Sequence, residues 1–194
     1  ATSGVNMATR NMVLDGAPVA STVSGNEFRF TPSSDLAEGQ HTVTATAADL
    51  AGNTGALGAT SFGLDATAPS VPVLSITEGQ TLAGTVAIWA TSTDPLSGVS
   101  YVDVYRNGSF LTRLNAPSLA GTWNTATLAD GPWTHTARAT DVAGNTSAFS
   151  APVNVVIDNH PLTVTITSPV TNFRTRFPVA GGATVGEPGA GVGL

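Results

Sequence analysis

The sequence predicts an all-β protein that is built as a tandem repeat. Short alternating polar and apolar segments, separated by Gly, Pro, Asn and Asp, run along the chain, and no stretch keeps apolar residues at helical spacing for three turns. A six-residue motif occurs twice, as Asp49-Leu-Ala-Gly-Asn-Thr54 and as Asp141-Val-Ala-Gly-Asn-Thr146. In a wider frame, residues 39–54 align without a gap with residues 131–146, at an offset of 92 (131 minus 39). The repeat is therefore about 90 residues long, the size of one small domain.

Composition excludes several classes of function. Charged residues make up only 10% of the 194 residues, and Lys is absent, so seven Arg against thirteen acidic residues give a net charge of −6. Binding to nucleic-acid phosphates needs clustered positive charge, so we expect no nucleic-acid partner. No apolar run approaches the roughly 20 residues that span a bilayer, so we expect no membrane insertion within these residues. The absence of Cys excludes disulfides and zinc–thiolate sites.

Catalytic patterns are missing as well. There is no Gly-x-Ser-x-Gly, and His41, His135 and His160 fall on predicted strands or a linker without a nucleophile motif nearby. We therefore expect no enzyme activity and no catalytic residue. His135 aligns with the inward-facing Val43, which predicts a core histidine bonded to the backbone. A platform for stacking sugars would need exposed aromatic residues on one face, and two Tyr and three Trp are few.

Hairpin turns are the clearest local signals. Asp15-Gly16 and Asn107-Gly108 are both dipeptides that favour two-residue hairpins. In the strand before the second turn, Val102 and Val104 are predicted to point to the core and Tyr101, Asp103 and Tyr105 to solvent. The predicted strands are residues 11–15, 19–24, 27–31, 41–48 and 59–64 in the first repeat; 73–76, 86–90, 101–106, 110–114, the segment around Trp123, 133–140 and 152–157 in the second; and 162–167 and 174–180 in a third.

Two short linkers divide the repeats. Asp65-Ala-Thr-Ala-Pro69 and Asp158-Asn-His-Pro161 each contain a proline, which disfavours helix in the residue before it. We expect three modules: residues 1–66, lacking the first strands; residues 67–158, complete; and residues 159–194, the start of a third. Two explanations of the incomplete end modules stay open: the chain is a window on a longer array, or strands of one chain complete the module of another.

Residues 130–146, together with the linker Leu64-Asp-Ala-Thr-Ala-Pro69, resemble the bacterial Ig-like repeats of large surface adhesins and multidomain secreted proteins. Ser3-Gly-Val-Asn6 and Gly186-Glu-Pro-Gly-Ala190 share the resemblance. It implies tandem immunoglobulin-like β-sandwiches of seven strands in two sheets, joined by short Pro-containing linkers. Antibody domains carry a Cys pair in the core, and this chain does not, so packing alone would hold each module together.

The resemblance implies a structural or adhesive stalk, or a spacer, of a secreted or cell-surface bacterial protein. Its partners would be the adjacent modules, with a cell-surface or matrix ligand contacted through other domains. Two alternatives stay open. The modules could be accessory domains of a secreted polysaccharide-degrading enzyme, or the chain could be the subunit of an extracellular fibre assembled by strand complementation.

A calcium site is the one ligand site that the pattern predicts. In an Ig sandwich, the loop between the second and third strands and the loop between the last two strands lie at the same end. Carboxylates gathered there repel one another unless a cation joins them, and Ca²⁺ takes 6–8 oxygen ligands. The alternative is turn chemistry, because Asp binds its own backbone amides and Gly-Asn tolerates left-handed backbone. The candidate ligands are Asp65, Asp94, Asp141 and Asn145.

Overall fold

The computed structural model describes residues 4–25, 27–168 and 180–186. Within these residues the regular structure consists of β-strands only, which confirms the predicted all-β class. No helix in the described part of the chain is long and apolar enough to cross a membrane. The contacts divide the chain into two compact units, the first made of Ala1–Ala68 with the short segments Pro95–Gly98 and Val142–Asn145, and the second of the remaining residues.

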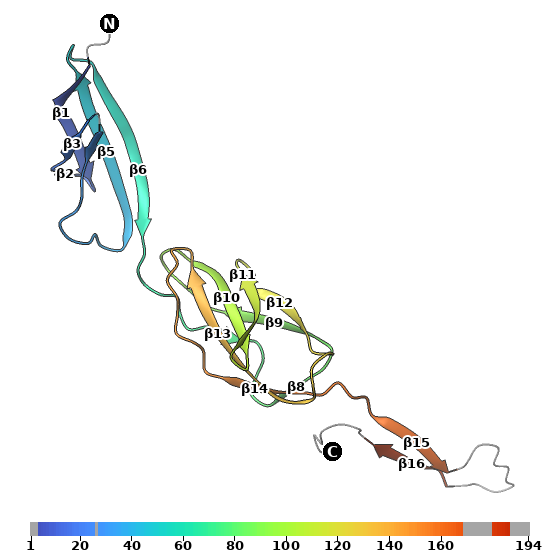
Figure 1. Cartoon of the computed structure of the whole chain (residues 1–194). Coiled ribbons are helices and arrows are strands. Elements are labelled where there is room, and N and C mark those ends of the chain that lie inside the picture. The colour runs from blue at the N-terminus through green and yellow to red at the C-terminus, as the bar shows by residue number, and fades with distance from the viewer. Residues whose placement is uncertain (1–3, 26, 169–179, 187–194) are drawn as a thin grey trace. The chain divides into compact units, whose positions relative to one another are not determined.

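The first unit contains one antiparallel sheet and a separate hairpin (Figure 1). Asp15 and Gly16 have φ values of 50° and 80°, so the first two strands are joined by the predicted two-residue turn with positive φ at both positions. The sheet has the order β2-β1-β5-β6. Its strands are β1 (Val5–Leu14), β2 (Ala17–Val19), β5 (Gly39–Asp49) and β6 (Thr54–Leu64), and the hairpin is β3 (Thr22–Ser24) with β4 (Glu27–Arg29).

A buried histidine ties the β1–β2 turn to β5. His41 Nδ1 lies 2.6 Å from Asp15 Oδ2, and His41 Nε2 lies 2.7 Å from the carbonyl oxygen of Ala37. Both ring nitrogens face acceptors, so the imidazolium form satisfies both contacts. The hydrogen bond to Asp15 raises the pKa of His41, and the same bond lowers the pKa of Asp15.

In the second unit two sheets pack face to face, and a separate pair of strands follows them in the chain (Figure 1). The five-stranded sheet has the order β11-β10-β13-β14-β8 and the three-stranded sheet the order β12-β9-β7. This arrangement confirms the predicted β-sandwich. The strands are β7 (Val73–Leu74), β8 (Gln80–Leu82), β9 (Thr85–Thr91), β10 (Val99–Arg106), β11 (Ser109–Asn115), β12 (Ala120–Asn124), β13 (Gly131–Asp141) and β14 (Val153–Ile157).

Two details of the second unit differ from the sequence prediction. The strand predicted at residues 73–76 ends at Leu74, and a further short strand, β8, pairs in parallel with β14 in the opposite sheet. The start of the module therefore contributes to both sheets.

Later in the chain, β15 (Thr163–Ser168) pairs with β16 (Gly182–Gly186). The strand predicted at residues 174–180 lies, apart from residue 180, outside the described residues.

Alternating buried residues on the strands build the core of the second unit. Val102 and Val104 on β10 are fully buried, as the sequence predicts. Asn107 and Gly108, with φ values of 46° and 78°, form the predicted hairpin turn to β11. From the three-stranded sheet, Ile88 and Trp123 pack against this face. The sandwich is held by packing of apolar side chains, since the chain has no Cys.

His135 corrects one expectation. Its inward position on β13 is confirmed, because it is fully buried with its ring centroid 4.7 Å from that of Trp123. The expected hydrogen bond to the backbone is wrong: neither ring nitrogen has a hydrogen-bond partner among the described residues. The neighbouring backbone groups are engaged in the ladders of β13 with β10 and β14. Burial, with a smaller contribution from Arg106, lowers the pKa of His135 to about 4.

We predict that His135→Leu stabilises the second unit and flattens its dependence on pH. An ordinary histidine has a pKa near 6.5. Between pH 6.5 and 4, His135 is therefore protonated in the unfolded chain and neutral in the folded chain. Stability is therefore full above pH 6.5 and falls by about 3 kcal/mol as the pH drops to 4. Chemical denaturation at pH 7, 5.5 and 4 measures this fall in the wild type and its loss in the variant. An equal fall in both proteins would contradict the assignment.

Candidate functional site

The linker that follows β6 in the first unit is held by a single carboxylate. Glu38 Oε1 accepts a hydrogen bond from the backbone N–H of Ala66 at 2.8 Å. The Thr67 hydroxyl donates to the same carboxylate at 2.7 and 2.9 Å. The backbone N–H of Thr67 donates to Asp65 Oδ1 at 3.0 Å, closing a local turn. Because Glu38 directly precedes Gly39, the first residue of β5, these bonds tie the linker to the sheet that it leaves.

The linker that follows β14 in the second unit is held in the same way. Asp130 Oδ1 accepts a hydrogen bond from the backbone N–H of Asn159 at 2.9 Å, and Asp130 Oδ2 pairs with Nδ1 of His160. The backbone N–H of His160 donates to Asp158 Oδ1 at 3.1 Å. Both oxygens of Asp130 are therefore occupied by donors from the linker.

These two arrangements are copies of one device, which we name the linker clasp. Asp130 stands 92 residues after Glu38 (130 minus 38), and each precedes a glycine with nearly the same backbone angle, φ 122° at Gly39 and φ 120° at Gly131. The linker residues stand 93 apart (158 minus 65). The clasp is defined as an acidic residue that accepts a backbone N–H and a side-chain donor from the following linker. The first clasp is Glu38 with Asp65, Ala66 and Thr67, and the second is Asp130 with Asp158, Asn159 and His160.

Asn159 ties the second linker to the body of the sandwich. Its side-chain oxygen accepts from the N–H of Gly84 at 3.1 Å and from the hydroxyl of Thr125 at 3.2 Å, and its amide donates to the carbonyl of Thr125 at 2.9 Å. Gly84 lies between β8 and β9, and the fully buried Thr125 directly follows β12. The linker therefore contacts segments that belong to both sheets.

The second clasp lowers the pKa of its acid. The N–H of Asn159 and then the contact with His160 lower the pKa of Asp130 below its usual value of 3.8. The stabilisation is present above that value and is lost as the pH falls through the lowered pKa. Asp130, Asp158 and His160 each also offer one metal-ligating atom, within 4.8 Å of one another. The hydrogen bonds of the clasp already account for this grouping.

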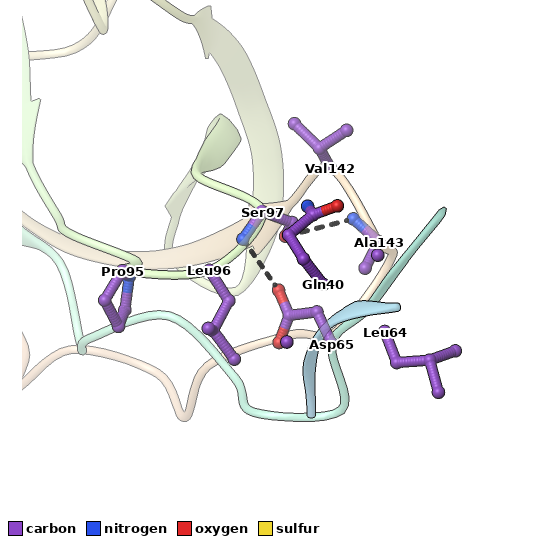
Figure 2. Close-up of a pocket in the computed structure, with 10 residues that line it drawn as sticks. Gln40, Leu64, Asp65, Pro95, Leu96, Ser97, Val142 and Ala143 are labelled. Atoms are coloured by element: carbon purple, nitrogen blue, oxygen red, sulfur yellow. Dashed lines mark hydrogen bonds between the residues drawn. The ribbon is translucent and has the colours of Figure 1, made fainter. Parts of the chain in front are cut away.

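Two of the predicted calcium ligands lie together in the first unit. Asp65 Oδ2 accepts from the backbone N–H of Ser97 at 3.1 Å, and the carbonyl oxygen of Asp65 accepts from the side-chain amide of Asn145 at 3.0 Å. Figure 2 shows Asp65 and Ser97 at a pocket of about 500 Å³ in this unit. Asp94 and the buried Asp141 belong to the second unit. In the chain, they directly precede the segments Pro95–Gly98 and Val142–Asn145. Calcium binding by these four residues stays a prediction.

The first copy of the repeated turn shows the turn chemistry that is the alternative to calcium binding. Asp49 Oδ1 accepts from the N–H groups of Ala51 at 2.9 Å and Asn53 at 2.8 Å, and Asp49 Oδ2 accepts from the Asn53 amide at 2.8 Å. The aspartate thus caps the backbone of its own turn. In this copy, hairpin chemistry alone explains why Asp and Asn stand four residues apart.

Aromatic rings lie close together on the solvent face of β10 and β11, and this grouping was not predicted from the sequence. Tyr105 contacts Phe110 and Phe149 with centroids 6.1 and 5.3 Å apart, at interplanar angles of 83° and 75°. The guanidinium of Arg113 covers the ring of Tyr101 at 3.6 Å. These rings are packed edge to face or capped by a cation, so they do not form the flat platform that stacks sugars.

Comparison with known families places this fold. Residues 3–66 match the family described as bacterial Ig-like domain, and residues 69–151 match the family described as bacterial Ig domain. The chain belongs to the bacterial Ig-like domains. The two matches correspond to two successive Ig-like domains, separated at the first linker. The resemblance inferred from the repeated turn and the linker is thereby confirmed.

Two curated relatives of this chain are named as enzymes. The chain is 38% identical over 135 residues to exoglucanase B of Cellulomonas fimi, covering 65% of this chain and 12% of that protein. It is 36% identical over 155 residues to chitinase A1 of Niallia circulans, covering 74% of this chain and 21% of that protein. The chain thus spans about a fifth or less of the length of these relatives.

Two solved structures align with most of this chain at low sequence identity. The fibronectin(III)-like modules of Clostridium thermocellum CbhA share 15% identity with a TM-score of 0.49, over 82% of this chain and 81% of that chain. A tetra-tandem repeat from the extending region of a large adhesion protein shares 22% identity with a TM-score of 0.36, over 87% of this chain and 46% of that chain.

Proposed function

We propose that these bacterial Ig-like modules are a non-catalytic spacer in a secreted or cell-surface bacterial protein, holding other domains at a set distance. The observation that carries the proposal is the repeated linker clasp. A short linker between two domains leaves their relative orientation free by default. A linker whose backbone N–H and next side chain both donate to one carboxylate has lost much of that freedom at its first residues.

The chemistry of the clasp suits a stiffening role. Hydrogen bonds to an ionised acceptor are stronger than those between neutral groups. Pro69 and Pro161 end the clasped linkers, and each ring fixes its own φ and restricts the residue before it. Hydrogen bonds at one end and proline at the other leave only a few backbone angles free in each linker.

A second candidate function is supported by the relatives. Exoglucanase B and chitinase A1 are named as enzymes, and this chain matches 12% and 21% of their lengths. Under this candidate, the modules are accessory domains that separate the parts of a secreted polysaccharide-degrading enzyme. The mechanical role is the same in both cases. Sequence flanking the 194 residues separates them, because a catalytic domain favours the accessory role and further repeats favour a stalk.

We predict that breaking the first clasp loosens the linker. The chain has no Cys, so Ser61→Cys and Ser109→Cys, both at exposed positions, provide unique sites for a pair of spin labels. Pulsed electron spin resonance should give a narrow distance distribution for this doubly labelled chain. Glu38→Ala should broaden it, because Ala66 and Thr67 lose their shared acceptor.

Asp35→Ala is the matched control, since Asp35 is an exposed acid of the same loop and is no part of the clasp. It should leave the distribution unchanged. A wild-type distribution as broad as that of Glu38→Ala would contradict a stiffening role. In that case, the modules would be flexibly linked and the spacer proposal would lose its supporting observation.

We also propose that Ca²⁺ binds at the module junction through Asp65, Asp94, Asp141 and Asn145. Three carboxylates with carbonyl and amide oxygens suit an ion that takes 6–8 oxygen ligands. Calorimetric titration should show saturable heat, and Ca²⁺ at 100 times its Kd should stabilise the protein by about 2.7 kcal/mol. The double variant Asp94→Asn with Asp141→Asn should abolish both effects, and Asp35→Asn should not. Absence of heat and of a melting shift in the wild type would overturn this proposal.

A further inference from the structure

An exposed tryptophan lies on the outer face of the three-stranded sheet in the second unit. It is Trp89, on β9, the central strand of that sheet (Figure 1). Exposure alternates along β9, so Ile88 and Ala90 are buried in the core while Trp89 between them is 51% exposed. Val73, on the neighbouring β7, is 66% exposed. The sheet therefore presents apolar side chains to solvent at its centre, although tryptophan is on average highly buried in proteins.

Trp89 makes none of the contacts that engage the other two tryptophans. Trp123 lies against His135 with ring centroids 4.7 Å apart, and the guanidinium of Arg106 lies 5.0 Å from the ring centroid of Trp133. Within the part of the chain that the structure describes, the Trp89 indole stacks on no ring, contacts no cation and donates its N–H to no acceptor. The indole is therefore available to a ligand.

Small side chains surround Trp89 on this face. Ala120 pairs with it directly across on β12, and Ala87 and Thr91 lie two residues away on β9, on the same side of the strand. On the side toward β7, Ser75 exchanges hydrogen bonds with the backbone of Trp89, at 2.9 and 3.0 Å. Side chains this short do not cover an indole, so its flat surface stays accessible.

The outer face of this sheet carries hydroxyl and amide groups and no charge. None of the residues of β7, β9 and β12 is ionisable. By contrast, the outer face of the five-stranded sheet carries Asp103, Arg113 and Arg138. A charged ligand would lose water at the uncharged face without gaining a partner of opposite charge. We name this surface the Trp89 face and define it as Trp89 with Ala87, Thr91, Ala120, Thr122 and Asn124.

The size of the Trp89 face separates a small ligand from a protein partner. β7, β9 and β12 contain two, seven and five residues, and only alternate residues point outward. A stable protein–protein interface takes about 20–30 residues from each partner. A sugar ring needs far less, because its C–H groups pack on one aromatic ring and its hydroxyls bond to nearby polar side chains.

We propose that the Trp89 face binds a neutral polysaccharide, with one sugar ring stacked on the indole. Thr91, Thr122 and Asn124 supply hydrogen-bonding groups for the hydroxyls of that sugar and the next ones along the chain. A single stacked ring binds a free sugar weakly, whereas a polymer presents the same ring many times. The ligand is therefore the polymer. This binding is independent of the spacer role, and variants of the linker clasp should not change it.

Affinity electrophoresis of the full chain tests the proposal. The native gels contain one of three neutral polymers: hydroxyethylcellulose, glycol chitin or soluble starch. At least one of them should retard the wild type. Trp89→Ala should weaken binding to that polymer at least about tenfold, because truncating a tryptophan anchor removes most of its contact. Trp89→Phe keeps an aromatic ring and should bind more tightly than Trp89→Ala.

Phe110→Ala is the matched control, because Phe110 is 58% exposed and lies on β11 in the other sheet. It should be retarded like the wild type. Trp89 is also exposed, so Trp89→Ala should melt at the wild-type temperature, which separates lost binding from lost folding. Carboxymethylcellulose should retard the wild type less than the best neutral polymer does, because the Trp89 face offers no cation.

Three results would overturn the proposal. The first is a wild type that none of the three neutral polymers retards. The second is a Trp89→Ala variant that is retarded as strongly as the wild type. The third is equal or stronger retardation by carboxymethylcellulose, which would show that charge and not stacking governs binding.

Discussion

The linkers depend on hydrogen bonds to one carboxylate, which stands directly before the glycine that begins β5 or β13. Glu38 and Asp130 each bind the backbone N–H of a linker residue and a side-chain donor one residue later. The clasp works because the linker returns past the start of a long central strand, so an acid at that place reaches it without bending the sheet. A neutral amide of the same size would offer one acceptor oxygen in place of two, and a weaker one.

The two copies of the clasp use different residues for the same contacts. Thr67 supplies a hydroxyl in the first linker, and His160 supplies a ring nitrogen in the second. Asn159 adds bonds to Gly84 and Thr125 that have no counterpart at Ala66, because alanine has no polar side chain. In the second linker, the residue after the aspartate is therefore also bonded to the body of the sandwich. The hydrogen-bond pattern of the clasp is therefore more similar between the two copies than the residues that form it.

Local sequence was sufficient for the features that depend on short-range geometry. Asn107-Gly108 predicts its hairpin because both residues tolerate positive φ, and the alternation around Val102 and Val104 predicts which face is buried. The clasp was not predicted, although the Glu-Gly and Asp-Gly pairs stand at the repeat offset, because its partners are 28 and 29 residues apart. Nor could sequence show that the His135 ring has no hydrogen-bond partner among the described residues, since this depends on strand pairing, which engages the backbone groups around it. The calcium ligands stay a prediction.

Amide hydrogen exchange at Ala66 and Asn159, followed by nuclear magnetic resonance at pH 5, tests the clasp most directly. Both amides donate to a carboxylate, so both should exchange at least about tenfold more slowly than an unbonded amide. Glu38→Ala should release Ala66 alone, Asp130→Ala should release Asn159 alone, and Asp35→Ala should release neither. Exchange of Ala66 and Asn159 at the rate of an open chain in the wild type would contradict the account.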